Sequence, residues 1–336
     1  MQLPGDRFSF SEKSGRKARR RKRVRIVSVV FLCAAVGAAG LLFFTNKLSF
    51  FSSDEGEQES AERGTDEGDS GGEEEDTSID KLWEQKDYVS INEKCAEVLE
   101  EEPLSARHLL YNGFAFFYRG ANQYSPEDQI PLFDKAIINL RKLLVLDSPP
   151  EEGKIHYVLG KAYYHKGRFY LDLAVEHLEE SVELGFTSSD TFRYLGLALG
   201  ELSSYEESIE AFLRASESGE GEDPILHMTI GQTYYRMDEN EKALEFLNRS
   251  AREADDTAVE QRSRFLLGKI YMDMEMYAEA GEQYEKILEK DSNSADAHYH
   301  LGEIFELQGD RVKARAEWRK ALNIEPSHYG ALLKLY

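Results

Sequence analysis

The stretch HYHLGEIF (298–305) decides the fold, because related octapeptides recur at nearly constant intervals toward the N-terminus. Each copy has an apolar residue, then a glycine, then an apolar or aromatic residue three positions later. Going back from Gly302, successive glycines are 34, 37, 35 and 36 residues apart. A period of this size predicts stacked supersecondary units. The four earlier copies are RFLLGKIY (264–271), HMTIGQTY (227–234), FRYLGLAL (192–199) and HYVLGKAY (156–163).

A second amphipathic stretch follows each copy and is clearest in KARAEWRKALNIEP (313–326), so each unit reads as helix, turn, helix. A sixth copy, LLYNGFAF (109–116), lies 47 residues before the next, and its extra length falls largely in ANQYSPEDQI (121–130). At the start, KDYVSINEKCAEVLEEEP (86–103) is typical of the second helix of a half unit. These patterns predict an all-α chain of six to seven units.

The arrangement resembles the tetratricopeptide-repeat (TPR) family, whose motif has large, Leu, Gly, Tyr, Ala, Phe, Ala and Pro at fixed positions. Departures include Asn112 in place of Leu, and Ser208 and Ser250 in place of alanines. The resemblance implies a right-handed superhelical solenoid in which glycine and alanine allow each helix pair to cross closely. In the last copy the motif positions hold His298, Leu301, Gly302, Phe305, Ala314, Trp318, Ala321 and Pro326.

The repeats divide most of the chain. We expect a half repeat at 77–104, six repeats and a short cap at 329–336. Each repeat can bury its apolar face only against a neighbour, so the array folds as one unit. The six predicted repeats are 105–150, 151–187, 188–222, 223–258, 259–294 and 295–328.

The N-terminus predicts a membrane anchor. Residues 1–25 hold ten Lys or Arg and two acids, and residues 26–44 (IVSVVFLCAAVGAAGLLFF) hold no charge. Nineteen residues span about 28 Å as a helix, close to the hydrocarbon thickness of a bilayer. The basic tail places the N-terminus in the cytoplasm and the rest outside it, in the periplasm if the source is bacterial. A cleaved signal peptide is the alternative interpretation, as is a lipoprotein anchored at Cys33.

Residues 45–76 predict a disordered acidic linker, because Asp54 to Asp76 contains twelve acids and one base. The net charge of the chain is −22, and about −20 of it falls after Asp76. A repeat domain of that charge does not favour nucleic-acid binding. The basic tail is accordingly interpreted as a topology determinant, with nucleic-acid binding as the weaker alternative.

No catalytic, phosphate-binding or metal-binding motif occurs in the sequence, so we expect no enzyme activity, no cofactor, no metal and no small-molecule substrate. The histidines His156, His227 and His298 could suggest a metal site, but they fall where the TPR motif places a large core residue. Cys33 lies in the predicted anchor and Cys95 in the repeats, which excludes a disulfide between them.

The resemblance implies a concave groove lined by the first helix of each repeat. The aligned residues are mainly aromatic and basic, which would suit an acidic protein segment with apolar anchors. Alternatively, several of the aromatics support neighbouring helices. The predicted groove residues are Arg107, Phe114, Phe117, Tyr118, Lys154, Tyr157, Lys161, Tyr164, Arg193, Tyr235, Arg236, Arg262, Phe265, Lys269 and Tyr299.

These features together favour a membrane-anchored protein-interaction scaffold or chaperone accessory that binds a partner segment in the groove, outside the cytoplasm. The alternative is a non-catalytic interaction subunit of a membrane-associated enzyme or envelope-assembly complex. Both functions use the same surface. They differ in the proteins that are expected to co-purify with the chain.

Overall fold

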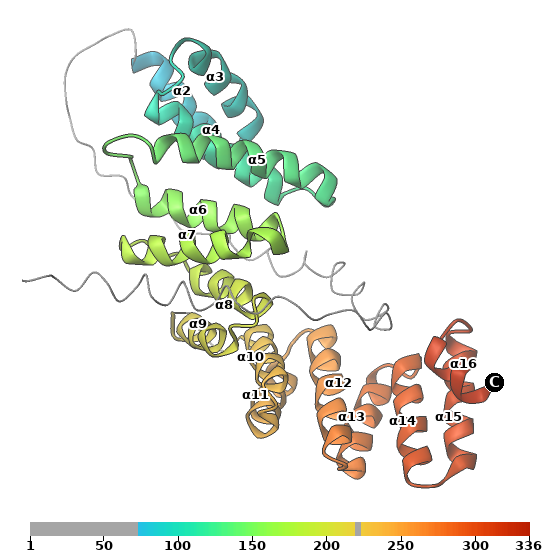
Figure 1. Ribbon diagram of the computed structural model, residues 1–336. Helices are drawn as coiled ribbons and strands as arrows, with labels where there is room; N and C mark the ends of the chain where they lie inside the picture. The colour runs from blue at the N-terminus through green and yellow to red at the C-terminus, as the bar shows by residue number, and fades with distance from the viewer. Residues whose placement is uncertain (1–72, 219–222) are drawn as a thin grey trace, which may run out of the picture. The chain divides into compact units, whose positions relative to one another are not determined.

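The computed structural model describes residues 73–218 and 223–336, which form fifteen α-helices and one 3₁₀ helix, with no strand in those ranges (Figure 1). The bounds of the first eight elements are α2 (Glu73–Glu84), α3 (Tyr88–Glu101), α4 (Ala106–Ala121), α5 (Pro126–Leu143), α6 (Glu152–His165), η2 (Arg168–Tyr170), α7 (Leu171–Glu183) and α8 (Thr191–Glu201). The others are α9 (Tyr205–Ser218), α10 (Pro224–Arg236), α11 (Asn240–Glu253), α12 (Thr257–Asp273), α13 (Tyr277–Lys290), α14 (Ala295–Leu307), α15 (Arg311–Ile324) and α16 (Tyr329–Leu335).

From α4 to α15 the helices pair in chain order into hairpins, and each hairpin contacts the one before and the one after it. The first helices of neighbouring hairpins also touch directly, as α4 does α6, α6 does α8 and α10 does α12. A chain whose contacts are all between near neighbours is the organisation of a repeat array. The all-α prediction is confirmed for the described residues.

The glycine in each first helix allows its hairpin to close. A Cβ at Gly302 would lie 2.3 Å from Trp318 Nε1, and one at Gly231 would lie 2.7 Å from Leu247 Cγ. Gly113, Gly160, Gly196 and Gly268 meet the same crowding from the second helix of their own hairpins. The predicted crossing of the two helices at this position is therefore present in all six hairpins.

The polar residues that depart from the TPR motif form hydrogen bonds within the fold. Asn92 donates to Asn112 Oδ1 at 2.8 Å, and Asn112 donates to Asn139 Oδ1 at 3.1 Å, which forms a buried amide chain. Ser208 donates to the carbonyl of Gly196 at 2.7 Å. Each polar replacement thus keeps a hydrogen bond where an unpaired buried group would cost about 1–3 kcal/mol.

Extra residues are absorbed in two places. The long spacing after Gly113 lengthens α5 to 18 residues. Ala174 follows Gly160 by two residues more than Ala314 follows Gly302, and this excess falls at η2. The first helix, α2, begins at Glu73, four residues before the predicted start of the repeats at 77. Its sequence opens with acidic residues, which are favoured in the first turn of a helix.

The predicted basic tail (1–25), membrane helix (26–44) and most of the acidic linker (45–76) lie outside the described residues. Within 73–218 and 223–336, no helix combines the length and apolar character that a bilayer span requires.

Candidate interaction surface

The fifteen predicted groove residues all lie on the first helices α4, α6, α8, α10, α12 and α14. Their environments differ. Some are buried between helices, some are engaged by acids of a neighbouring hairpin, and some are exposed. These three groups decide which residues can contact a partner.

The buried group is aromatic. Phe114, Phe117 and Tyr164 are each 3% exposed, and Tyr157 is 7% exposed. Their side chains fill the space between hairpins, as the alternative interpretation of these aromatics held. Their rings therefore present little surface to a ligand, and the candidate surface is reduced to the remaining residues.

Tyr118 and Phe265 are half-buried and support neighbouring rings. Tyr118 stacks on Tyr88 with ring centroids 5.1 Å apart and meets Trp83 edge-on at 5.8 Å. Phe265 packs against Tyr284 at 5.8 Å. Both residues remain partly exposed.

Arg107 is held by an acid of α2. Its guanidinium donates to both oxygens of Asp80 at 2.8 Å, and Tyr111 donates to the same carboxylate at 2.6 Å. Burial and the Asp80 carboxylate together raise the pKa of Tyr111. Lys154 lies 3.0 Å from Glu151 and 5.4 Å from the centroid of the Phe114 ring.

Lys161 is the most enclosed of the predicted bases, at 8% exposure. Its ammonium donates to Asp190 at 2.6 Å and to the hydroxyl of Tyr157 at 2.8 Å, and that hydroxyl donates to Asp190 at 2.5 Å. Burial, followed by the Asp190 charge, raises the pKa of Tyr157. The triad joins α6 to the N-terminus of α8.

Arg193 repeats this arrangement one hairpin later. Its guanidinium donates to Asp223 at 2.5 Å. The other oxygen of Asp223 accepts from the backbone N–H groups of Ile225 and Leu226 at 3.0 Å, which caps α10. A single carboxylate thus ends a helix and ties it to the preceding hairpin.

Arg236, Arg262 and Lys269 are the exposed group, and none has an acid partner within the described residues. The ammonium of Lys269 lies 5.3 Å from the centroid of the Tyr235 ring, and the Tyr235 hydroxyl donates to Asp273. We call Tyr235, Arg236, Arg262, Phe265 and Lys269 the α10/α12 surface.

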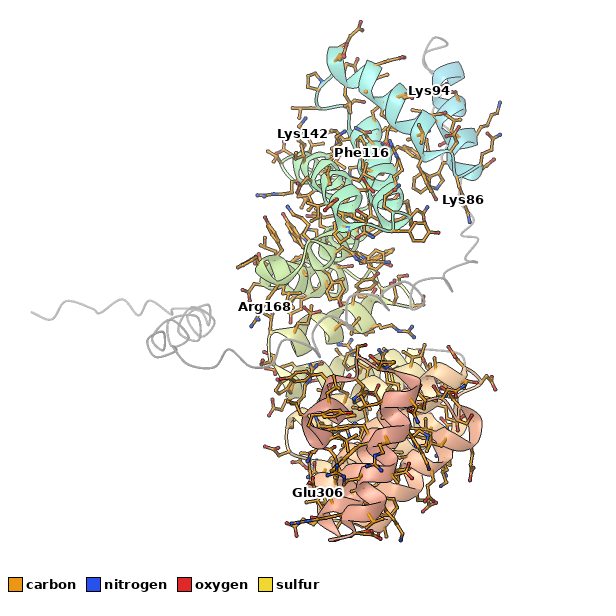
Figure 2. The ribbon with its side chains drawn as sticks, turned by 90° about the vertical axis from the view of Figure 1, so that its right-hand side faces the viewer. Lys86, Lys94, Phe116, Lys142, Arg168 and Glu306 are labelled. Carbon is orange, nitrogen blue, oxygen red and sulfur yellow. The ribbon has the colours of Figure 1, made fainter. Side chains whose placement is uncertain are left out.

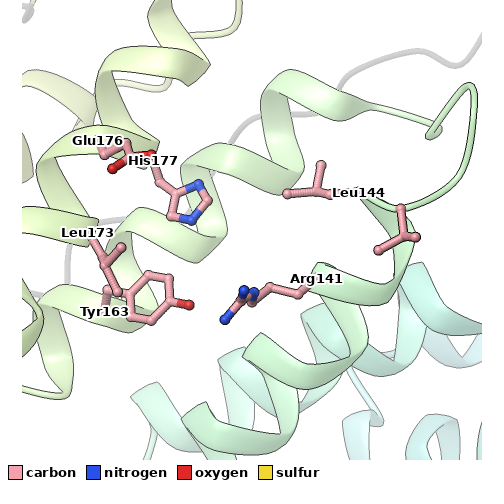
Figure 3. A pocket seen from close by; sticks show the side chains of 7 residues that line it. Arg141, Leu144, Tyr163, Leu173, Glu176 and His177 are labelled. Atoms are coloured by element: carbon pink, nitrogen blue, oxygen red, sulfur yellow. The ribbon is translucent and has the colours of Figure 1, made fainter. Parts of the chain in front are cut away.

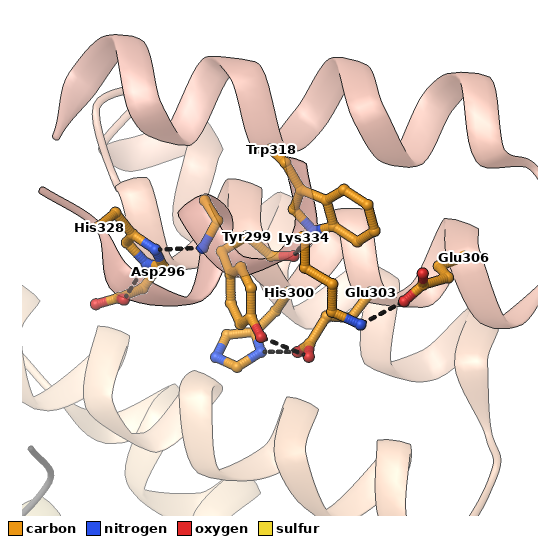
Figure 4. A network of polar contacts seen from close by, with 9 residues as sticks. Asp296, Tyr299, His300, Glu303, Glu306, Trp318, His328 and Lys334 are labelled. Carbon is orange, nitrogen blue, oxygen red and sulfur yellow. Dashed lines mark hydrogen bonds and ion pairs between the residues drawn. The ribbon is translucent and has the colours of Figure 1, made fainter. Parts of the chain in front are cut away.

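Side chains of α16 and of the residue that caps it contact α14, the first helix of the last hairpin (Figure 4). Tyr299 donates to Glu303 at 2.7 Å and its ring packs on His328 with centroids 5.0 Å apart. His328 contacts Asp296 at 3.0 Å, and Lys334 pairs with Glu306. The acids of this helix are therefore engaged within the chain, and α16 occupies the face that Tyr299 was predicted to offer.

Sequence reasoning missed the acids that engage the bases. Asp190 follows Lys161 by 29 residues and Asp223 follows Arg193 by 30. An acid at the start of the next first helix, slightly less than one repeat after a base, is the signal that could have revealed both pairs.

Three family models match the described hairpins. Two models of the tetratricopeptide repeat match residues 195–258 and 295–328, and a model described as TPR repeat matches residues 268–309. The matched residues, 195–258 and 268–328, carry tetratricopeptide repeats. TPR hairpins are in general non-catalytic modules that bind other proteins. No curated protein matches the chain.

One solved TPR structure shares the fold with a TM-score above 0.5, and two others are similar over part of the chain. The C-terminal part of a TPR repeat-containing protein from Cytophaga hutchinsonii is 17% identical, covers 77% of this chain and 99% of its own, and has a TM-score of 0.58. YrrB, a TPR protein with an unusual peptide-binding site, is 23% identical over 60% of this chain and 96% of its own, with a TM-score of 0.45. MamA from Desulfovibrio magneticus RS-1 is 19% identical over 54% and 98%, with a TM-score of 0.46.

Proposed function

We propose that this chain is a membrane-anchored interaction scaffold, and that its α10/α12 surface binds an acidic segment of a partner protein outside the cytoplasm. The observation that carries the proposal is the set of three exposed cations, Arg236, Arg262 and Lys269, that have no acid partner within the described residues. One of them, Lys269, also lies 5.3 Å from the centroid of the Tyr235 ring. All three belong to a chain of net charge −22. A carboxylate-bearing partner supplies the charges that the surface lacks.

The geometry of α12 supports a linear partner. Arg262 and Lys269 are seven residues apart, two turns of the helix, so they lie on one face about 10 Å from each other. Phe265 lies between them on that face, and Tyr235 of α10 adjoins Lys269. Exposed ion pairs contribute only about 0–1 kcal/mol each, so the rings must supply much of the affinity.

The membrane anchor at residues 26–44 and the outward orientation are supported by the uncharged run and by the ten bases that precede it. Protease treatment of intact cells or spheroplasts tests the orientation. We expect external protease to digest the repeats, and deletion of residues 26–44 to release the chain from the membrane fraction. Repeats that stay protected until the membrane is lysed would contradict it.

Photo-crosslinking tests the surface. A benzophenone amino acid at Arg262 of the full-length chain in intact cells should capture a partner that the same probe at Glu285, exposed on α13, does not capture. Several envelope proteins among the captured species would favour the scaffold. A single stoichiometric enzyme subunit would favour the alternative role in an enzyme complex.

Binding of the captured partner to purified full-length chain then tests the charges. We expect replacement of Arg236, Arg262 and Lys269 by alanine to weaken binding at least about tenfold and to reduce its salt dependence. The matched control removes the same charge from α15, by replacing its exposed Arg311, Arg315 and Arg319. Equal loss in both triple variants would show a nonspecific charge effect and would refute the proposed surface.

A further inference from the structure

A pocket of about 360 Å³ opens between α5 and α7, and none of its lining residues belongs to the α10/α12 surface (Figure 3). Arg141 and Val145 border it from α5 and from the turn that follows, Tyr163 from α6, and Leu173 and His177 from α7. The function proposed above makes no use of this pocket.

Two polar groups in the pocket have no partner in the described part of the chain. Tyr163 is 4% exposed, and no hydrogen bond from its hydroxyl occurs among the described residues. Figure 3 shows that hydroxyl pointing toward the guanidinium of Arg141, which is exposed and has no acid partner there. A hydroxyl and a guanidinium that face the same space, and that have no partner among the described residues, are matched donors for a carboxylate.

Three of the seven residues that line the pocket are aliphatic, and two of these three are exposed. Val145 is 82% exposed and Leu173 is 37% exposed, and Leu144 lies beside Val145. Two more apolar side chains extend these edges, Ile138 on α5 at 56% and Leu184 at the end of α7 at 44%. Ile138 lies three residues before Arg141 on α5, less than one helical turn away, so an exposed apolar side chain adjoins the pocket lining on that helix.

Neutral rings form one side of the pocket. His177 stacks on Tyr163 with centroids 5.4 Å apart, and its Nδ1 lies 3.1 Å from Nδ1 of His156. Burial, then the neighbouring His156 and Arg141, lower the pKa of His177 to about 4. Near neutral pH the charged groups lining the pocket are therefore Arg141 and Glu176.

We propose that this pocket is a second docking point, which binds an acidic residue and an adjacent apolar residue within a segment of a partner protein. The carboxylate accepts hydrogen bonds from Arg141 and from the Tyr163 hydroxyl, and the apolar side chain packs against Leu144, Val145 and Leu173. Glu176 faces the same pocket, so a segment with a single acid fits better than one with several.

The apolar edges indicate an internal segment rather than a small molecule or a chain end. Ile138 and Leu184 lie outside the pocket lining, and only a ligand that continues along α5 and α7 would cover them. A free carboxylate at a chain end would need the pocket alone.

Three probes distinguish the carboxylate of an acidic side chain from that of a chain end: N-acetyl-Glu-Leu amide, N-acetyl-Gln-Leu amide and N-acetyl-leucine. Each is titrated into the full-length chain in detergent, labelled with ¹³C at Leu and Val methyl groups. We expect N-acetyl-Glu-Leu amide to shift the Leu144, Val145 and Leu173 signals with a Kd of about 1 mM, since so small a ligand gains little binding energy. The glutamine probe should bind about tenfold more weakly because it cannot pair with the guanidinium charge.

Two variants test whether Arg141 and the Tyr163 hydroxyl donate hydrogen bonds to the carboxylate of the probe. Tyr163→Phe removes only an oxygen without a partner, and Arg141→Ala changes an exposed side chain, so both should keep the fold. Each should weaken the Glu-Leu probe about fivefold to tenfold. Lys142→Ala (Lys142 in Figure 2), an exposed neighbour outside the pocket lining, should leave binding unchanged. Three outcomes would overturn the proposal. The glutamine probe could bind as tightly as the Glu-Leu probe, or N-acetyl-leucine could bind more tightly than it. The third is the absence of any methyl shift at 10 mM Glu-Leu probe, about ten times the expected Kd.

Discussion

The ammonium of Lys161 on α6 lies 2.6 Å from the carboxylate of Asp190, the residue that precedes α8. The side chains are only 10% and 17% exposed, and the Tyr157 hydroxyl bonds to both. A pair this enclosed holds two hairpins in one relative position. It also makes each charge depend on the other, because an unpaired ion would be left where water has little access.

We therefore expect Asp190→Ala to destabilise the repeats by about 3–5 kcal/mol, because it leaves the Lys161 charge buried without its partner. Urea unfolding followed by circular dichroism measures the loss. The matched control is Glu282→Ala, which breaks the exposed Lys286–Glu282 pair and should cost less than about 1 kcal/mol. Similar losses in the two variants would show that the Lys161 pair is solvated in solution.

A second prediction concerns two glycines at which replacement by alanine should change stability in opposite directions. At Gly231 an added Cβ would lie 2.7 Å from Leu247 and 3.1 Å from the carbonyl of Ala243. We expect Gly231→Ala to destabilise the protein by about 1–3 kcal/mol through overpacking. At Gly281 on α13 the nearest atom is 4.0 Å away, so Gly281→Ala should stabilise it by about 0.5–1 kcal/mol.

Thermal and urea unfolding of the two variants check this prediction. Gly281→Ala gains from the lower backbone entropy of alanine in the unfolded chain, and Gly231→Ala has the same gain but loses the helix crossing. Two stabilised variants would mean that the hairpin can open at no cost.

The hairpins were predictable from the sequence because their packing is local. Gly302 and Trp318 meet within one unit of 34 residues, and the period repeats that meeting along the chain. The role of Tyr157 and Phe117 was not predictable in the same way. Helix periodicity gives the face on which a ring lies, but the space between hairpins decides whether that ring is buried.

The engagement of the bases was harder to predict for a related reason. Arg193 on one hairpin contacts Asp223 at the start of the next, and that contact depends on the angle between the two hairpins. The pocket at Tyr163 depends on three helices and on the turn that follows α5, so no single motif marks it. The repeat pattern therefore predicts the packing within a hairpin, whereas the contacts between hairpins can be identified only from the structure.

Asp223 gives a third prediction because one carboxylate has two structural roles. Asp223→Ala removes the cap of α10 and the Arg193 contact together, and we expect a loss of about 2–4 kcal/mol. Asp256→Ala removes only the cap of α12, at the Ala258 N–H, and should cost about 1 kcal/mol.

A double-mutant cycle with Arg193→Ala separates the two roles of Asp223. The coupling between Arg193 and Asp223 should be about 0.5–3 kcal/mol in urea unfolding. A coupling near zero would leave the cap as the whole effect.

The pH dependence of stability gives the last prediction, through His177. Burial, His156 and Arg141 lower the pKa of His177 from its usual 6.5 to about 4 in the folded state. The unfolded chain therefore binds a proton at a higher pH than the folded chain does. The stability from this group is complete above about pH 6.5 and is lost progressively as the pH falls toward about 4.

We expect His177→Gln to flatten the decrease in unfolding free energy between pH 7 and pH 5, by about 1–2 kcal/mol relative to the unmodified chain. Urea midpoints at the two pH values measure it, with His108→Gln on α4 as the control. His156 is half-buried and keeps its own lowered pKa, so part of the slope should remain in the variant. An unchanged slope would show that His177 is protonated in the folded protein at pH 5, and would place a positive charge in the pocket beside Arg141.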